Sequence, residues 1–335
     1  MYYLSMHFFH DRLVDYALEV FPGFHDAGRV DSFFSLFLPG NTRYTSERPH
    51  ERFSDYEELL WKLMERYPDR YQQAHKGTPF YFMSWLAFDL RNFEKALFYI
   101  DAAISEDVRN GGAGWRNLPG TRFLLLDPEG GAAQRTVRVI RSLLDRELKR
   151  FNGISDLRAL DIDTTWREFV NDLLLDEDQR TVVSALYVFL LEFDDRLREL
   201  KLREGSRGGS NQPFTVHLFT GGLIFESLLK RAYPTSDNGG NNDTLGDILK
   251  HTQQFLRDFK LTQAPETYAT SLEEIHRAIK NGSSVDTAFS TTAKLRNTTG
   301  HNLVWDNIFS APAKYEDLFR QVMNALLYVI AVKGP

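Results

Sequence analysis

The chain contains no cysteine among its 335 residues. This absence excludes disulfide bonds, thiolate metal sites and cysteine nucleophiles, and it is typical of a reducing compartment, so we expect a cytoplasmic protein. No apolar run approaches the roughly 18 residues that a membrane span needs. The longest candidate, VVSALYVFLLEF at 182–193, is too short, and charged residues interrupt the first twenty positions where a signal peptide would be apolar. We therefore expect no membrane partner.

An excess of positive charge is also missing, because the formal net charge is −6. This balance argues against a protein that binds nucleic acid through a surface covered with positive charge. The sequence lacks a glycine-rich phosphate loop, a nucleophile elbow and the ligand spacing of a zinc site. We therefore expect neither a cofactor nor a metal ion.

Strand patterns are scarce, and TRFLLLD at 121–127 is the one segment that we interpret as a possible short strand. Elsewhere the apolar residues recur at helical spacing. Ser54 and Glu57 have the spacing of a capping box at the start of one such helix. The last helix is predicted to begin near Pro312, since proline is favoured at the first helical position. The fold class predicted by these patterns is all-α.

The helical pattern is interrupted at LREGSRGGSNQPF, residues 202–214, where glycine, serine, asparagine and proline replace the apolar residues. A chain of this length is expected to form about two domains. We therefore predict a helical recognition or regulatory domain over 1–200 and a helical bundle over 201–335, with a start near 180 as the alternative for the bundle.

Within the first domain, residues 82–107 resemble a tetratricopeptide-like helical hairpin. A turn is predicted at Arg91 and Asn92, and residues that permit close helix packing follow at Ala96, Tyr99 and Ala103. The resemblance covers about one repeat, whereas a solenoid needs about three to bury a continuous core. Two interpretations stay open: a repeat array, or an irregular helical domain with alanines at one close crossing.

The segment LRNTTGHNLVW, residues 295–305, gathers Arg296, Asn297 and His301 at the end of a predicted helix. At about 100° per residue, Arg296 and His301 would lie roughly 140° apart around an unbroken helix. Gly300 is predicted to end the helix and so to let the two side chains converge. Convergence across a subunit boundary is the alternative.

The hexapeptide RNTTGH resembles the signature of HEPN domains, in which an arginine followed by a polar residue precedes a histidine. The surrounding segments also look like the helices of such a bundle; they are 214–234, 244–259, 286–302 and 315–333. The resemblance implies a metal-independent endoribonuclease of toxin or antiviral-defence type, with RNA as its substrate. It also implies a homodimer in which two motifs face one cleft.

The residue types suit this reaction. Histidine exchanges protons near neutral pH, so His301 is the expected acid or base. Arginine offers a planar, permanently charged fork for two phosphate oxygens, so Arg296 is expected to stabilise the charge on the phosphate, with Asn297 orienting either residue. The neighbouring residues that we expect to contact the substrate are Lys294, Thr298, Thr299 and Asn302.

Less specific interpretations compete with this one. His301 would be an inert histidine at a helix end, and Arg296 a surface residue bonded to a carboxylate such as Asp306. Glu226 is interpreted as a surface glutamate, with a place in the cleft as its alternative. On that basis the protein would be a non-catalytic helical adaptor, whose first domain binds a protein or a small ligand. A nucleotide-binding regulator is the third possibility.

Overall fold

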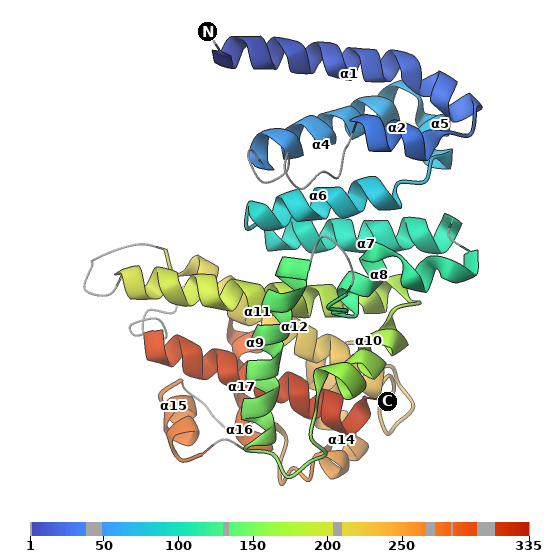
Figure 1. Ribbon diagram of the computed structural model, residues 1–335. Helices are drawn as coiled ribbons and strands as arrows, with labels where there is room; N and C mark the ends of the chain where they lie inside the picture. Colours follow the sequence, from blue (N-terminus) through green and yellow to red (C-terminus); the bar gives the residue numbers. More distant parts are fainter. Residues whose placement is uncertain are drawn as a thin grey trace. The chain divides into compact units, whose positions relative to one another are not determined.

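The computed structural model describes residues 2–37, 49–110, 112–129, 134–203, 210–265, 272–282, 284–299 and 312–334. They belong to two compact units, Met1–Arg138 and Val139–Pro335, and each unit is described by itself (Figure 1). The described residues form helices and no strand, and their one β-type pairing is an isolated bridge between Thr235 and Asn241. The predicted all-α class is confirmed. No helix in the described ranges combines the length and the apolar character of a membrane span.

The first unit stacks its helices so that each packs mainly on neighbours in the sequence (Figure 1). Its elements are α1 (Tyr2–Asp26), α2 (Val30–Phe37), α4 (Pro49–Arg66), α5 (Pro68–Gln73), α6 (Gly77–Asp89), α7 (Phe93–Asn110), the 3-10 helix η1 (Gly112–Asn117) and α8 (Pro119–Leu124). Aromatic side chains fill the spaces between them, for example Phe21 and Phe33, whose ring centroids lie 5.0 Å apart. Such burial of aromatic surface dominates the stability of a helical stack.

The predicted hairpin is present as α6 and α7. Arg91 adopts a positive φ of 58° in the turn, and its N–H and that of Asn92 donate to carbonyl oxygens at the end of α6. Ala96 and Ala103 of α7 are completely buried, and α6 and α7 pack on each other. Ala103 also faces α8, because a Cβ at Gly120 would lie 3.5 Å from Ala103 Cβ.

Two local predictions in this unit are wrong. Residues 121–127 do not form a strand, because Pro119 begins the short helix α8, in which Thr121 and Phe123 are buried. A short apolar run has no periodicity that separates a strand from a buried helical turn. Ser54 does not cap a helix, because α4 already begins at Pro49.

The second unit begins with α9 (Gln134–Asn152), most of which belongs to it. The remaining elements are the π-helical turn η2 (Ile162–Trp166), α10 (Arg167–Leu173), α11 (Glu177–Arg203), α12 (Gln212–Ala232), α13 (Leu245–His251), α14 (Gln253–Asp258), α15 (Leu272–Lys280), α16 (Val285–Thr299) and α17 (Pro312–Lys333). The predicted start of the last helix at Pro312 is confirmed. The segment 244–259 forms two helices, because Thr252 between them is extended, with φ −127° and ψ 93°.

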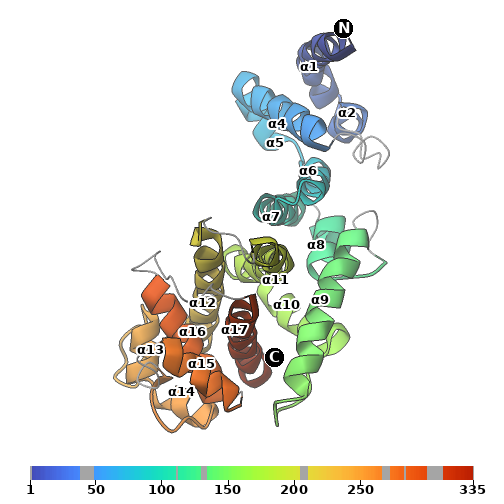
Figure 2. The ribbon, with the colours of Figure 1, turned by 90° about the vertical axis from the view of Figure 1, so that its left-hand side faces the viewer.

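A bundle of α11, α12, α16 and α17 forms the core of this unit. Helix α17 is buried along almost its whole length, from Tyr315 to Ile330. It lies between α12 and α9 (Figure 2), and Arg150 of α9 donates a 2.8 Å hydrogen bond to Asn324 of α17. A helix that is apolar on nearly every side is expected to be central, and α17 is.

The second unit starts at Val139, whereas the composition of residues 202–214 placed the boundary at 200/201. The reason is that α11 packs along α12 and α17. Phe193 of α11 stacks on Phe319 of α17 with ring centroids 3.7 Å apart. The glycine-rich segment therefore connects two helices of one bundle.

Candidate functional site

The Arg-Asn pair of the motif lies in the last turn of α16. The helix is held by apolar side chains that face α12 and α17, among them Ala288, Phe289 and Leu295, which are fully buried. Arg296 and Asn297 follow this buried stripe and are only partly buried. The packing of α16 therefore fixes the backbone position from which the Arg296 side chain extends.

Arg296 is held by a carboxylate from another helix. Its Nε donates a 2.6 Å hydrogen bond to Glu226 Oε2 on α12. Its Nη1 also donates to the side-chain oxygen of Asn297 at 3.3 Å. The Arg296 side chain is 27% exposed and that of Glu226 is 6% exposed, so the pair sits at the edge of the core.

Glu226 is shared by several donors. Lys230, one turn further along α12, places its Nζ 2.9 Å from Oε1, and the backbone N–H of Leu245 donates to the same oxygen at 3.2 Å. Burial by itself raises the pKa of Glu226, but the hydrogen bonds from Lys230 and Arg296, together with their charges, outweigh it and lower the pKa. The carboxylate is therefore ionised at neutral pH and orients the guanidinium.

Two adjacent glycines in the middle of α12 let the neighbouring helices approach. A Cβ at Gly222 would lie 2.7 Å from Arg296 Cβ and 3.2 Å from its Cα. A Cβ at Gly221 would lie 2.6 Å from Val322 of α17 and 2.7 Å from Phe189 of α11. Glycine inside a helix costs about 1 kcal/mol relative to alanine, and here the close packing of three helices offsets that cost.

Sequence reasoning underestimated Glu226. The preferred interpretation as a surface glutamate is wrong, because Glu226 is only 5% exposed, and the alternative of a place in the cleft stays a prediction. A usable signal exists in the spacing, since Gly222, Glu226 and Lys230 lie four residues apart and so share one face of α12. The carboxylate bonded to Arg296 is thus Glu226, whereas the suggested Asp306 lies outside the described residues.

The other predicted site residues divide into two groups. Lys294 is partly buried on α16, and Thr298 and Thr299 complete its last turn, although the structure does not describe the side chains of these two threonines. Gly300, His301 and Asn302 lie outside the described residues. The convergence of His301 with Arg296 therefore stays a prediction.

His217, a buried histidine of α12, has a structural role. Its Nε2 donates to the carbonyl oxygen of Phe189 at 2.8 Å, and its Nδ1 accepts from the Tyr315 hydroxyl at 2.7 Å. Complete burial lowers the pKa of His217 to about 3, so the ring is neutral. Both ring nitrogens are used inside the core, where substrate cannot reach them.

The first unit contains a second group of ionisable residues. His75, just before α6, places Nε2 2.8 Å from Asp107 Oδ1 of α7. The Asp107 side chain is 5% exposed and that of His75 is 29% exposed. The next residue, Lys76, is buried, and its backbone N–H donates to Glu106 at 3.0 Å. The hydrogen bond to Asp107 raises the pKa of His75 although burial opposes it, and the charges of Asp107, Asp31 and Glu106 act in the same direction as the bond.

In the ranges that the structure describes, no group of three or more His, Asp and Glu side chains is arranged to hold a metal ion. Among the described residues of the motif, Arg296 is a cation held in place by Glu226. A guanidinium has five N–H donors, and Glu226 and Asn297 occupy two of its nitrogens. Its remaining donors suit a phosphate or another small anion.

Comparison with models of known protein families, with curated proteins and with solved structures finds no match for this chain.

Proposed function

We propose that the second unit is a metal-independent endoribonuclease of HEPN type, with Arg296 as the residue that binds the scissile phosphate. The observation that carries the proposal is the 2.6 Å bond from Arg296 Nε to the buried Glu226. A charge that stabilises a transition state is most effective when it is already fixed in place, and this bond holds the guanidinium at the start of the motif. The segment that follows it carries His301.

In the proposed reaction the 2′-hydroxyl of RNA attacks the adjacent phosphorus. The leaving 5′-oxygen takes up a proton, and the product ends in a 2′,3′-cyclic phosphate. Arg296 stabilises the negative charge on the phosphate oxygens, and His301 transfers a proton. Asn297 accepts from Arg296 Nη1 and restricts its rotation. Lys294, Thr298, Thr299 and Asn302 bind the flanking RNA.

A homodimer is part of the proposal, and one face of α12 supports it. Val216 and Leu223 on this face are 42% and 41% exposed. Between and beyond them, the hydroxyls of Thr220 and Ser227 bond to carbonyl oxygens of their own helix at 3.0 and 2.9 Å. The face thus combines two exposed apolar side chains with two hydroxyls that are bonded within their own helix, and it adjoins the stripe that carries Glu226. A second copy on this face would bring two motifs together.

The biological setting is an extension of the same proposal. An RNA-cleaving unit of toxin or antiviral-defence type needs a part that restrains or triggers it. The first unit, with its α6–α7 hairpin, would supply this part by binding a protein or a small ligand. Expression of the wild type should arrest growth, and expression of Arg296→Ala or His301→Ala should not.

The direct test is incubation of the purified protein with total RNA in EDTA, followed by analysis of the fragment ends. We expect cyclic phosphate ends from the wild type and no cleavage by Arg296→Ala or His301→Ala. Arg320→Ala is the matched control, because Arg320 bonds to Glu316 on the exposed side of α17. Equal cleavage by all four proteins would reject the proposal and indicate a contaminating nuclease.

The dimer has its own test. Leu223→Glu should yield a monomer by light scattering and should reduce cleavage, because the proposed cleft needs both copies. Leu175→Glu is the control, since Leu175 is 67% exposed and lies outside α12. If the wild type is already a monomer at the concentration at which it cleaves RNA, the dimeric cleft is wrong.

The same ion pair also favours a second candidate, a non-catalytic adaptor. Arg296 already has a buried partner, and an arginine that only joins α12 to α16 needs nothing more. In that case Arg296→Ala lowers stability but leaves partner binding and cellular phenotype intact. Thermal stabilisation by nucleotides without RNA cleavage would instead favour a nucleotide-binding regulator.

A further inference from the structure

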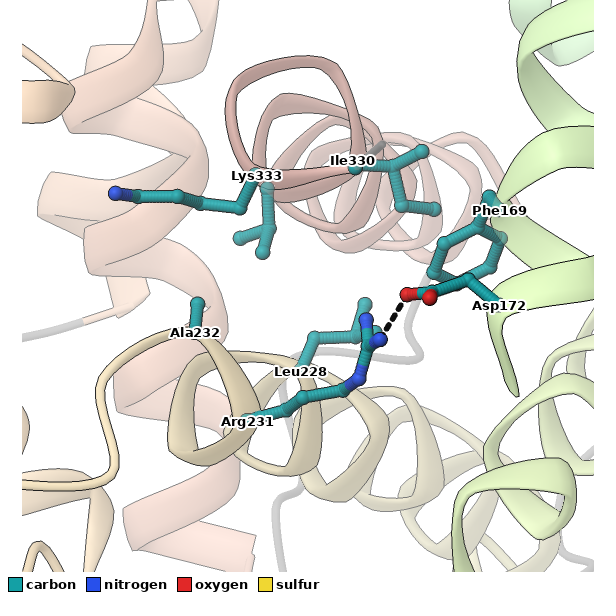
Figure 3. Close-up of a pocket in the computed structure, with 9 residues that line it drawn as sticks. Phe169, Asp172, Leu228, Arg231, Ala232, Ile330 and Lys333 are labelled. Atoms are coloured by element: carbon teal, nitrogen blue, oxygen red, sulfur yellow. Dashed lines mark hydrogen bonds and ion pairs between the residues drawn. The ribbon is translucent and has the colours of Figure 1, made fainter. Parts of the chain in front are cut away.

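A pocket of about 300 Å³ opens in the second unit where α10, α12 and α17 meet (Figure 3). Its apolar wall is formed by Phe169, Leu228, Val329 and Ile330. These residues come from all three helices, so the pocket belongs to the bundle and not to a loop. It is separate from Arg296, which is not among its lining residues.

A single ion pair forms the polar wall of this pocket. Arg231 near the end of α12 donates from Nη2 to Asp172 Oδ2 of α10, as the dashed line in Figure 3 marks. The two side chains are 30% and 47% exposed, so a ligand in the pocket can reach both. Opposite charges thus stand side by side next to an apolar surface.

Lys333 also borders the pocket, but its ammonium group is used elsewhere. Figure 3 shows the amine pointing away from Arg231 and Asp172. Lys333 Nζ forms an ion pair with Asp258 and lies 4.7 Å from the centre of the Tyr233 ring. Among the described lining residues, the charged groups that face a ligand are therefore the Arg231 guanidinium and the Asp172 carboxylate.

We propose that this pocket binds a small zwitterion with an apolar side chain, namely an α-amino acid such as leucine or phenylalanine. The carboxylate of the ligand pairs with Arg231, and its ammonium group pairs with Asp172. Its side chain packs against Phe169, Leu228 and Ile330. This site is independent of the proposed nuclease, because it uses none of the motif residues.

Charge balance selects the zwitterion over singly charged ligands. A monoanion at Arg231 would lie beside the Asp172 carboxylate, and a monocation at Asp172 would lie beside the guanidinium. Each therefore meets a like charge next to its partner. A zwitterion meets an opposite charge at both ends, and the planar guanidinium suits a carboxylate in two-point contact.

Size limits the ligand further. Pockets for small molecules run from about 300 to 1,000 Å³, so this one is at the lower limit. This volume is sufficient for a single amino acid. Since the terminal residue of a peptide carries only one of the two charged groups, free amino acids and peptide ends can be separated by experiment.

Calorimetric titration of the full chain with L-leucine and L-phenylalanine tests the proposal. We expect saturable binding of at least one of them, and binding at least tenfold weaker for leucinamide, which lacks the carboxylate, and for N-acetyl-leucine, which lacks the ammonium group. No saturable heat with either amino acid up to about 10 mM, well above a weak Kd of 1 mM, overturns the proposal. Equal binding of the blocked analogues also overturns it, because the two charged contacts would then be unnecessary.

Variants locate the site. Arg231→Met and Asp172→Asn should each weaken binding at least tenfold, whereas Arg320→Met, which breaks the surface pair with Glu316, should leave it unchanged. Ala232→Trp fills the pocket from its wall and provides a second test if the ion-pair variants fail to fold. Wild-type binding by folded Ala232→Trp, judged by circular dichroism, would place the ligand elsewhere.

Discussion

Each unit of the protein contains a carboxylate that is buried beside a glycine, and the two differ in the cation that partners it. In the second unit Glu226 is bonded to Arg296 and Lys230, with Gly222 against Arg296. In the first unit Asp107 is bonded to His75, and a Cβ at Gly77 would collide with this pair. A buried carboxylate needs a positive partner or hydrogen bonds, and both sites supply them.

The difference lies in whether the partner can lose its charge. Arginine stays protonated at any pH that a folded protein tolerates, whereas histidine changes charge near neutral pH. The pair in the second unit, Glu226 and Arg296, is therefore a fixed ion pair, which suits a residue that must always offer positive charge to a ligand. The pair in the first unit, His75 and Asp107, is a contact between α7 and the segment before α6 that weakens when His75 is neutral.

Removal of the carboxylates gives the largest expected effect and separates the two sites. Glu226→Ala leaves a charged, partly buried Arg296 and should cost about 3 kcal/mol of local stability. Asp107→Ala at pH 8 should cost about 1 kcal/mol, because His75 can shed its proton. Hydrogen exchange of α16 and α7 amides measures both. The local stability of the surface variant Glu316→Ala should stay within about 0.5 kcal/mol of that of the wild type. Equal losses of stability in Glu226→Ala and Asp107→Ala would contradict the distinction between the two ion pairs.

Alanine in place of the glycines is expected to have a smaller effect, which depends on the neighbouring atoms. Gly222→Ala meets the Cα and Cβ of Arg296, which cannot move without α16, and should cost about 2 kcal/mol. Gly77→Ala meets the end of the Asp107 side chain, which can rotate away, and should mainly break the bond to His75. Gly23→Ala in α1 meets nothing within 4 Å and should be neutral or slightly stabilising. Thermal unfolding ranks the three, and a neutral Gly222→Ala would contradict the close approach of α12 and α16.

The smallest expected effect is a loss of stability as the pH rises above neutral, and it concerns the first unit. The folded-state pKa of His75 is raised, so its bond to Asp107 contributes fully below the ordinary histidine pKa of about 6.5 and is lost as the pH rises through the raised value. We expect a loss of about 1 kcal/mol across that window, seen as faster exchange at the start of α6, and no such change in His75→Gln.

The carboxylate at Glu226 titrates in the opposite sense. Because its folded-state pKa is lowered, its contribution is present above the unfolded value and disappears as the pH falls through the folded value. The pH range over which this contribution is lost is therefore acidic and lies well below the range for His75. If amide hydrogen exchange in both units changed over the same pH range, this result would contradict the distinction between a permanently charged partner, Arg296, and a titratable partner, His75.

Local patterns in the sequence predicted the helices better than the contacts between them. The start of α17 follows from Pro312, and the α6–α7 hairpin follows from Arg91, Asn92 and the alanines after them. These features depend on residues that are close in the chain. The helical start at Ser54 failed because Pro49 initiates α4 earlier, which the apolar spacing alone does not reveal.

The candidate site was only half accessible to sequence reasoning. The motif singled out Arg296 and Asn297, which are in contact on α16. Their partner Glu226 lies 70 residues earlier in the chain. Its four-residue spacing from Gly222 and Lys230 indicates a shared helix face but does not show that this face packs against α16. The Gly-Gly pair of α12 was visible, but its meaning depends on which helices cross there. Such information comes from packing and not from local periodicity.

The most direct test of the central claim is the rate of RNA cleavage by Arg296→Lys in EDTA under single-turnover conditions. Lysine keeps the positive charge near Glu226 but not the planar fork, so the fold should persist while the rate falls at least about 100-fold, as expected when a preorganised charge-stabilising donor is lost. Cleavage by the lysine variant at the wild-type rate would contradict the claim, because Arg296 would then serve only to join two helices.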